Sequence, residues 1–395
     1  MLNAIRSLFT RSHKGGTSQD PYLAEMFGMR ATGSGAYVSP DSASGIPAVH
    51  ACVQLIAESI ASLPLAVYRR ADGGGREVDR LHPLYRVLNE QANAVQTGME
   101  FREWLLASCL LTGNGYALKE IDGRGAITAL HPLLPGTVYP EKLVNGRVRY
   151  VVTRETGTDR YTQDEIFHLR YRTADGYTGL SPITIARETL GLARAQQQHE
   201  GAFYRNGARF SGLLKTAGSM ENEKYEQIRQ RLDALYGGAE NSHKMLILSG
   251  GLEFQPFSMN HRDAEFIESR RLTMEDIARI FRVPPPFIGI LADATYSNIT
   301  EQGRWLVMHC LRPWFVRIER AMAAQLLSSD ARRTITIEHN AEGLLRGSTK
   351  DRNEAYRIAR EWGWMSVNEI REKENMAPVE GGERYLEPMN MARAE

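Results

Sequence analysis

The sequence carries no excess charge of either sign and has few cysteines. Its 395 residues include 48 Lys and Arg against 47 Asp and Glu, which gives a formal net charge of +1 at pH 7. This balance provides no general attraction for a phosphate backbone, so nucleic-acid binding driven by bulk charge is excluded. Cys52, Cys109 and Cys310 lie far apart in apolar segments without metal-ligand spacing, and this pattern indicates buried, reduced thiols.

Long apolar runs are also missing. No window reaches the roughly 18 uninterrupted apolar residues that a helix needs to span a bilayer, so no membrane insertion is expected. The first ten residues lack the apolar core and the cleavage site of a signal peptide. With 42% hydrophobic and 24% charged residues, the composition is typical of a folded globular protein with two or three domains.

The motifs of the common enzyme classes are absent. There is no G-x-x-x-x-G-K-[ST] phosphate loop, no G-x-S-x-G and no H-E-x-x-H, and residues 113–115 lack the third glycine of a dinucleotide-binding turn. His82 and His131 each precede a proline at the edge of an apolar run, where a structural histidine is the simpler interpretation. We therefore expect no cofactor and no metal site.

One acidic segment leaves a catalytic alternative open. Five carboxylates in a predicted helix could hold the two metal ions of a nuclease: Asp263, Glu265, Glu268, Glu275 and Asp276. The same pattern fits a solvated acidic face of a helix, which is the interpretation that we favour. A metal-dependent DNA-processing enzyme is kept as the alternative function.

Helix and strand signals predict an α+β first half. Residues 1–45 are rich in Gly, Ser, Thr and Asp over most of their length, and are predicted to be a flexible arm. Apolar periodicity predicts helices at 46–62 and 99–112, and a short helix from His82. Strands are predicted from β-branched and aromatic runs: 65–70, 116–121, 129–133, 147–153 and 165–171. Residues 46–180 are therefore expected to form one α+β domain.

Long helices dominate the second half. Ser181 followed by Pro182 predicts one helix of about 25 residues. A small module at 208–260 should contain strands at 213–215 and 244–248 around a helix, before a second long helix at 261–283. Two final helices are predicted to begin at Ser348 and Ser366, each with an acidic residue three positions later.

The strongest punctuation is Val283 followed by three prolines. Three consecutive prolines cannot lie inside a helix, because each lacks a backbone N–H and disfavours a helical predecessor. A loop should follow to residue 298, where Asn298 and Glu301 have capping-box spacing. The next helix should run over 299–327, roughly 40 Å long and kinked at Pro313. Its predicted apolar face is Trp305, Met308, Leu311, Phe315, Ile318, Met322 and Leu326.

The proline-bounded loop carries the candidate functional residues of the sequence. Its polar and aromatic side chains have few ways to be buried, and such loops often carry function. The candidates are Phe287, Asp293, Thr295, Tyr296, Ser297 and Asn298.

The order and spacing of its short motifs resemble those of the portal proteins of tailed bacteriophages, the HK97-like family. The resemblance runs from about residue 43 to residue 390 and rests on the order of several short motifs. They are AVHACV at 48–53 leading to SLPL at 62–65, HPL at 82–84, LTGNGYA at 111–117, GLSP at 179–182, IAR at 277–279 before VPP at 283–285, and NEIR at 368–371.

The resemblance implies a portal fold and a ring, with twelve subunits in the family pattern, at one capsid vertex. Genomic double-stranded DNA would enter and leave through the ring without sequence-specific contacts. The implied parts are a wing at 46–180, stem helices at 181–207 and 261–283, a small α/β clip at 208–260, a channel loop at 284–298, a long wing helix and strand at 299–347, and a short helical crown with a tail at 348–395.

The resemblance also implies sites and partners. The loop candidates would face the channel, as would four residues of the second stem helix: Asp263, Glu268, Arg270 and Arg271. Lys215, Tyr225 and Lys244 of the clip would take part in docking the terminase large subunit and later a head–tail adaptor protein. Other implied partners are copies of the same chain and the major capsid protein, with no membrane partner.

The particle would be assembled in the bacterial cytoplasm, and could be a phage or a gene transfer particle. The balanced charge suits a channel in which DNA slides. No catalysis is expected. A monomeric capsid adaptor is the non-enzymatic alternative.

Overall fold

The fold is described by a computed structural model that divides the chain into two compact units, Met1–Glu338 and His339–Glu395. The described residues are 31–71, 75–205, 212–216, 223, 226–227, 230, 252–256, 262–291, 296–341, 349–374 and 376–386. Within the described residues no helix is long and apolar enough to cross a membrane.

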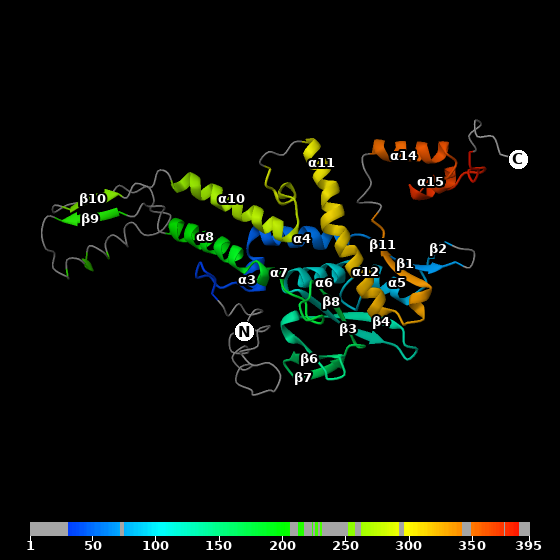
Figure 1. Cartoon of the computed structure of the whole chain (residues 1–395), viewed down its shortest axis with the longest axis horizontal. Helices are drawn as coiled ribbons and strands as arrows, with labels where there is room; N and C mark the ends of the chain where they lie inside the picture. Colours follow the sequence, from blue (N-terminus) through cyan, green and yellow to red (C-terminus); the bar gives the residue numbers. More distant parts are fainter. Residues whose placement is uncertain are drawn as a thin grey trace. The chain divides into compact units, whose positions relative to one another are not determined.

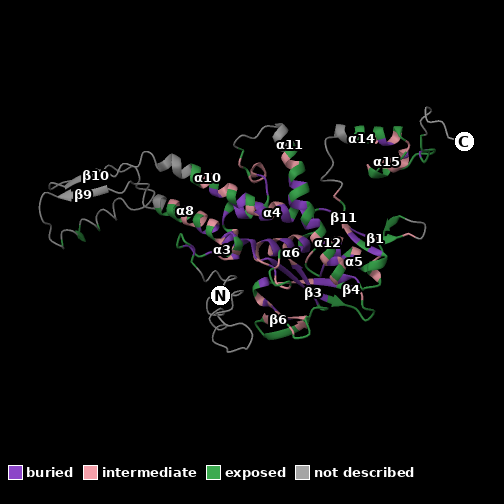
Figure 2. Ribbon diagram, viewed as in Figure 1, coloured by how far each residue is buried: buried purple, intermediate pink, exposed green. Residues whose placement is uncertain are grey.

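The core of the first unit is built on two helices, α4 (Pro47–Ala61) and α6 (Gly98–Thr112), which pack against each other. Figure 2 shows both as largely buried. Pro47 starts α4, where its missing N–H costs nothing. A capping box between Thr97 and Glu100 starts α6, and Gly113 ends it at φ 81°. A Cβ on Gly113 would lie 2.5 Å from the carbonyl carbon of Leu180, so only glycine fits there.

Three antiparallel strands cover α6: β4 (Ile127–Leu133), β3 (Asn114–Ile121) and β8 (Ile166–Arg170), with β3 in the middle. A second sheet contains β5 (Val138–Lys142), β6 (Val148–Arg154) and β7 (Gly157–Thr162). Tyr116 of the first sheet packs with Val138, Tyr150 and Val152 of the second, which joins the two sheets in one apolar cluster.

A third small sheet has the order β11 (Ile335–His339), β1 (Leu65–Arg70) and β2 (Arg76–Val78). Helix α5 (Pro83–Asn89) packs on β1 and β4, and begins at His82, whose Nδ1 accepts a hydrogen bond from the Leu84 N–H. The structural interpretation of His82 is thus confirmed, and so is the α+β class of this part of the chain. β2 and β7 were not predicted because both are almost wholly exposed and lack apolar alternation.

Two predicted boundaries need correction. The flexible arm does not extend to residue 45, because Pro40–Ser44 form helix α3 and Ala43 is fully buried; residues 1–30 lie outside the described residues. The single helix expected after Ser181 is two helices, α7 (Pro182–Ile185) and α8 (Arg187–Arg205). Ser181 donates to the Leu111 carbonyl and so anchors α7 to α6, and the backbone turns at Ala186 before α8 begins.

The second unit contains α14 (Thr349–Glu361) and α15 (Val367–Lys373). The predicted capping box at Ser366 is confirmed, since its hydroxyl accepts from the Glu369 N–H and the Glu369 carboxylate accepts from the Ser366 N–H. The hydrogen bond from the Ser366 N–H to the carboxylate, together with one from Tyr385, lowers the pKa of Glu369. Ser348, the other predicted cap, lies outside the described residues.

Candidate functional site

Two long helices run side by side in opposite directions, α8 and α10 (Arg262–Phe281) (Figure 1). Their contact is polar. The Gln196 side chain donates to Ser269 Oγ over 3.1 Å, and the Glu200 carboxylate accepts two hydrogen bonds from Arg270, at 2.5 and 2.7 Å. Arg270, one of the predicted channel residues, is therefore held against α8.

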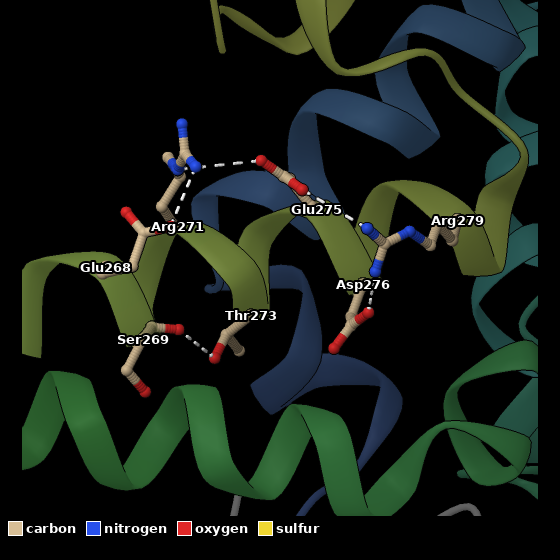
Figure 3. A network of polar contacts seen from close by, with 7 residues as sticks. All are labelled: Glu268, Ser269, Arg271, Thr273, Glu275, Asp276 and Arg279. Carbon is tan, nitrogen blue, oxygen red and sulfur yellow. Dashed lines mark hydrogen bonds and ion pairs between the residues drawn. The ribbon is translucent and has the colours of Figure 1, made fainter. Parts of the chain in front are cut away.

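Charged side chains alternate along another face of α10 (Figure 3). Arg271 lies between Glu268 at 2.8 Å and Glu275 at 3.8 Å. Arg279 contacts Glu275 at 3.3 Å and also pairs with Asp276. These three carboxylates and two guanidinium groups are called the α10 ladder below. Pairs of this spacing stabilise a helix by about 0.2 to 0.5 kcal/mol each.

The ladder corrects the expectation of an acidic face. Each described carboxylate of the predicted cluster is ion-paired to arginine, so the face has mixed charge. In the described part of the chain no three His, Cys, Asp or Glu residues are grouped so that they could hold a metal ion. The side chains of Asp263 and Glu265 lie outside the described residues. The nuclease alternative therefore gains no support from the described geometry.

The end of α10 has an unusual backbone conformation. Arg282 has φ 58°, in the left-handed region that glycine normally occupies after a helix. The Val283 N–H bonds the Ala278 carbonyl at 2.9 Å and the Arg282 N–H bonds the Arg279 carbonyl at 3.1 Å, which is the Schellman pattern. Val283 is 3% exposed, so the chain enters the proline run through a buried residue.

The proline run is partly helical, contrary to prediction. Pro285–Ile288 form a short 3-10 helix, η3, that ends at Gly289 with φ 86°. Pro285 and Pro286 fit there because the first turn of a helix needs no N–H donors. Phe287 is half-buried, and a Cβ on Gly303 of the following helix would lie 3.7 Å from its ring. Phe287 therefore packs against that helix.

The next helix, α11 (Tyr296–Trp305), begins three residues before the predicted start. Tyr296, Ser297 and Asn298 lie in its first turn, so the expected loop to residue 298 and the Asn298 cap are wrong. Glu301 pairs with Arg304 at 3.1 Å instead of capping the helix. The spacing of a capping box also occurs inside helices, which explains the error. Asp293 and Thr295 lie outside the described residues, as do the side chains of 296–300.

The predicted irregularity at Pro313 takes the form of a π-helical segment, η4 (Leu306–Leu311), before α12 (Arg312–Leu326). Proline cannot donate to the fourth residue before it and clashes with that carbonyl, and a wider turn relieves both problems. The extra residue in the turn rotates the helix face. Trp305 and Met308, predicted to lie on an apolar face that forms core or a subunit interface, are 44% and 48% exposed in the single chain, whereas the stripe from Leu311 to Leu326 is buried.

Helix α12 is fixed to the sheet by contacts that the sequence did not reveal. The Gln325 side chain accepts from the His168 N–H at 2.8 Å and donates to the His168 carbonyl at 3.0 Å. Arg317 donates to the carbonyls of Arg170 and Tyr171. These partners are far apart in sequence and have no local signal.

The imidazole of His168 is part of a buried polar cluster. Its ring bonds Tyr150 Oη and Asn114 Oδ1 at 3.0 and 2.9 Å. Because Asn114 Oδ1 can only accept, Nε2 is the protonated nitrogen of the ring. Burial, with a smaller contribution from Arg170, lowers the pKa of His168 well below its usual range.

The cysteine prediction is confirmed for all three thiols. Each is free and buried, and burial raises the pKa of Cys52, Cys109 and Cys310 to about 12. Cys310 donates to the Phe281 carbonyl over 3.4 Å, so η4 is tied to the end of α10. The proline run therefore begins where the end of α10 and η4 meet.

Between α8 and α10, β9 (Gly212–Thr216) and β10 (Leu252–Pro256) form an antiparallel pair. The strand predicted at 213–215 is confirmed, and its partner is 252–256. Residues 244–248, Tyr225 and Lys244 lie outside the described residues, as does the side chain of Lys215.

Comparison with known proteins gives consistent matches over most of the chain. The family model described as phage portal protein matches residues 47–375. The portal protein of Enterobacteria phage HK97 is 32% identical over 342 residues, which cover 86% of this chain and 80% of that protein. The probable portal protein of Streptomyces phage phiC31 is 30% identical over 390 residues, covering 94% and 84%. A chain from the neck of a native gene transfer agent particle, computed with C12 symmetry, superposes with TM-score 0.60 at 25% identity, covering 96% and 99%.

Proposed function

The chain belongs to the phage portal protein family, and we propose that about twelve copies of it form a ring at one vertex of a capsid, through which double-stranded DNA is packaged and later ejected. The ring size follows from the C12 symmetry of the similar gene transfer agent neck. A head-to-tail interface with a closing rotation produces such a ring.

The observation that carries the proposal is the path of the chain from α10 into the loop. Helices α8 and α10 form the proposed stem, and residues 284–298, which include η3 and the first turn of α11, form the proposed channel loop. The prolines and the buried Val283 fix the direction in which the chain leaves α10, while Cys310 ties the helix behind the loop to the same point. A loop anchored on both sides can project towards DNA without rearranging its supports.

The α10 ladder suits a surface past which DNA slides. Its arginines are paired with carboxylates, so they bind phosphate less strongly than unpaired arginines would. We propose that Glu268 and Arg271 face the channel. A weak contact repeated about twelve times around the ring guides DNA without holding it at one position.

The segment between α8 and α10, with strands β9 and β10, is proposed as the clip. It would dock the terminase large subunit during packaging and a head–tail adaptor protein afterwards. The α+β part of the first unit would be the wing that meets the major capsid protein, and α14 and α15 a short crown. No catalytic role is proposed, since portal proteins are structural components of the particle.

Electron microscopy and mass measurement of the purified full-length chain test the proposal. A ring with a central opening is expected. A monomer under all conditions would favour the adaptor alternative. Metal-dependent cleavage of DNA that is lost in Asp263→Ala would favour the nuclease alternative.

The proposed channel loop is tested in assembled particles. Deleting residues 291–295 should leave the ring intact but reduce the DNA that particles package or retain. As a control, the turn at 123–125 between β3 and β4 can be replaced by a two-residue turn, which should leave DNA content unchanged. Particles with the loop deletion that fill and hold DNA normally would contradict this role.

A further inference from the structure

Arg282 adopts a backbone conformation that opposes its side chain. Among the described residues it is the one non-glycine residue with positive φ. An L-residue in this region is disfavoured relative to glycine by a clash between its Cβ and the backbone. The two Schellman hydrogen bonds and the buried Val283 hold the backbone in place, so the conformation is set by the fold and would be easier for glycine.

The guanidinium of Arg282 also differs from its neighbours. Arg270, Arg271 and Arg279 of the same helix are each paired with a carboxylate. Arg282 is exposed, and no side chain in the described part of the chain forms a hydrogen bond or ion pair with it. The favourable charge at the end of α10 is already supplied by Arg279, in the last turn. Among the described residues, no contact of the folded chain requires arginine at this position.

We infer that Arg282 contacts the phosphate backbone of DNA beside the channel loop, an inference that rests on the proposed function. A guanidinium without a carboxylate partner among the described residues is a good ligand for a phosphate oxygen. The contact is independent of base sequence, because phosphates carry no sequence information. One such contact from each subunit would slow the release of packaged DNA.

Three variants separate charge from backbone strain. Arg282→Lys keeps the charge, Arg282→Gln removes the charge but keeps the strain, and Arg282→Gly removes both. Each variant gene replaces the wild-type gene in cells that produce particles. The amount of nuclease-protected DNA per particle is then followed over time at several salt concentrations. We expect release to be about tenfold faster for the Gln and Gly variants and nearly unchanged for Lys.

The Gly variant gives a readout that a purely structural role cannot imitate. Its purified ring should unfold at a temperature roughly 1 to 3 °C higher than the wild type, because strain is relieved, although its particles hold DNA less well. Arg124→Gln, at an exposed turn between β3 and β4, is the matched control and should change neither property.

Other outcomes overturn the inference in distinguishable ways. Normal DNA retention by the Gln variant would show that Arg282 does not contact DNA. Loss of the ring in the Gln variant, seen by mass, would assign Arg282 to a contact between subunits. A Gly variant that is less stable than the wild type would show that the fold uses the side chain. If the wild-type chain forms no ring, the proposed function itself fails.

Discussion

Helices α10 and α12, which lie before and after the proline run in the sequence, are held by different forces. Helix α12 is packed into the α+β part of the molecule, where Met322 is fully buried and Gln325 bonds both backbone groups of His168. Before its buried last turns, α10 is held to α8 by the partly exposed Arg270–Glu200 pair and the Gln196–Ser269 hydrogen bond, and its own outer face carries the α10 ladder. Figure 2 shows the same contrast between α4 and α6, largely buried, and the more exposed α8.

This difference predicts how α10 and α12 respond to salt and to substitution. Apolar burial and buried hydrogen bonds are nearly independent of salt, whereas exposed ion pairs are screened by it. The proline run therefore lies in the sequence between α10, whose pairing with α8 responds to ionic strength, and the firmly packed α12. The four predictions below test this contrast, from the largest effect to the smallest.

Met322→Ala should have the largest effect. The substitution leaves a cavity beneath α12 and should lower the free energy of unfolding by about 3 kcal/mol. Val316 lies on the same helix and is 48% exposed, so Val316→Ala should change the free energy of unfolding by less than about 0.5 kcal/mol. Chemical denaturation of the two variants measures the difference, and equal effects would show that α12 is not packed as described.

Gln325→Ala should cost about 2 kcal/mol, because the N–H and carbonyl of His168 lose their partners. Gln325→Glu tests the geometry, since it keeps the acceptor for the N–H but loses the donor to the carbonyl. It should be destabilising as well. A neutral result for the alanine variant would mean that water or another group replaces the amide.

Stability should fall as the pH drops below about 6.5, the ordinary pKa of histidine. Burial depresses the pKa of His168 in the folded chain, so the unfolded chain binds more protons below that pH and is favoured. The loss approaches about 1.4 kcal/mol per pH unit for this one group. His82, whose pKa is also lowered by burial, adds in the same direction.

His168→Gln tests the assignment of this pH dependence. Denaturation curves between pH 5 and pH 8 should have a smaller slope in this variant than in the wild type. An unchanged slope in His168→Gln would assign the dependence to other groups.

The smallest effect is expected at the stem. A double-mutant cycle of Arg270→Gln and Glu200→Gln should give a coupling of about 0.5 kcal/mol at low salt, because both side chains are partly exposed. The coupling should decrease in 1 M salt. A larger coupling that does not change with salt would show that the helices of the stem are held as firmly as α12.

Local signals explain the successful sequence predictions. Ser366 starts a helix with the predicted capping box, and Gly113 ends a helix at positive φ directly after the predicted end at residue 112. Each of these features depends on residues within a few positions, so it can be recognised from the sequence.

The failed sequence predictions also have a local cause. Asn298 and Glu301 have the spacing of a cap but lie inside α11, and the π-helical segment before Pro313 changes which residues before it are buried.

The sequence by itself determined the family, the α+β class and the interruption at the proline run, because these depend on short-range patterns and on motif order. Only the tertiary structure decided that Arg270 pairs with Glu200, that Gln325 bonds His168 and that Arg282 has no partner among the described residues. Such contacts join residues far apart in the chain, or depend on the exact rotation of a helix. A pattern of residue types does not specify either.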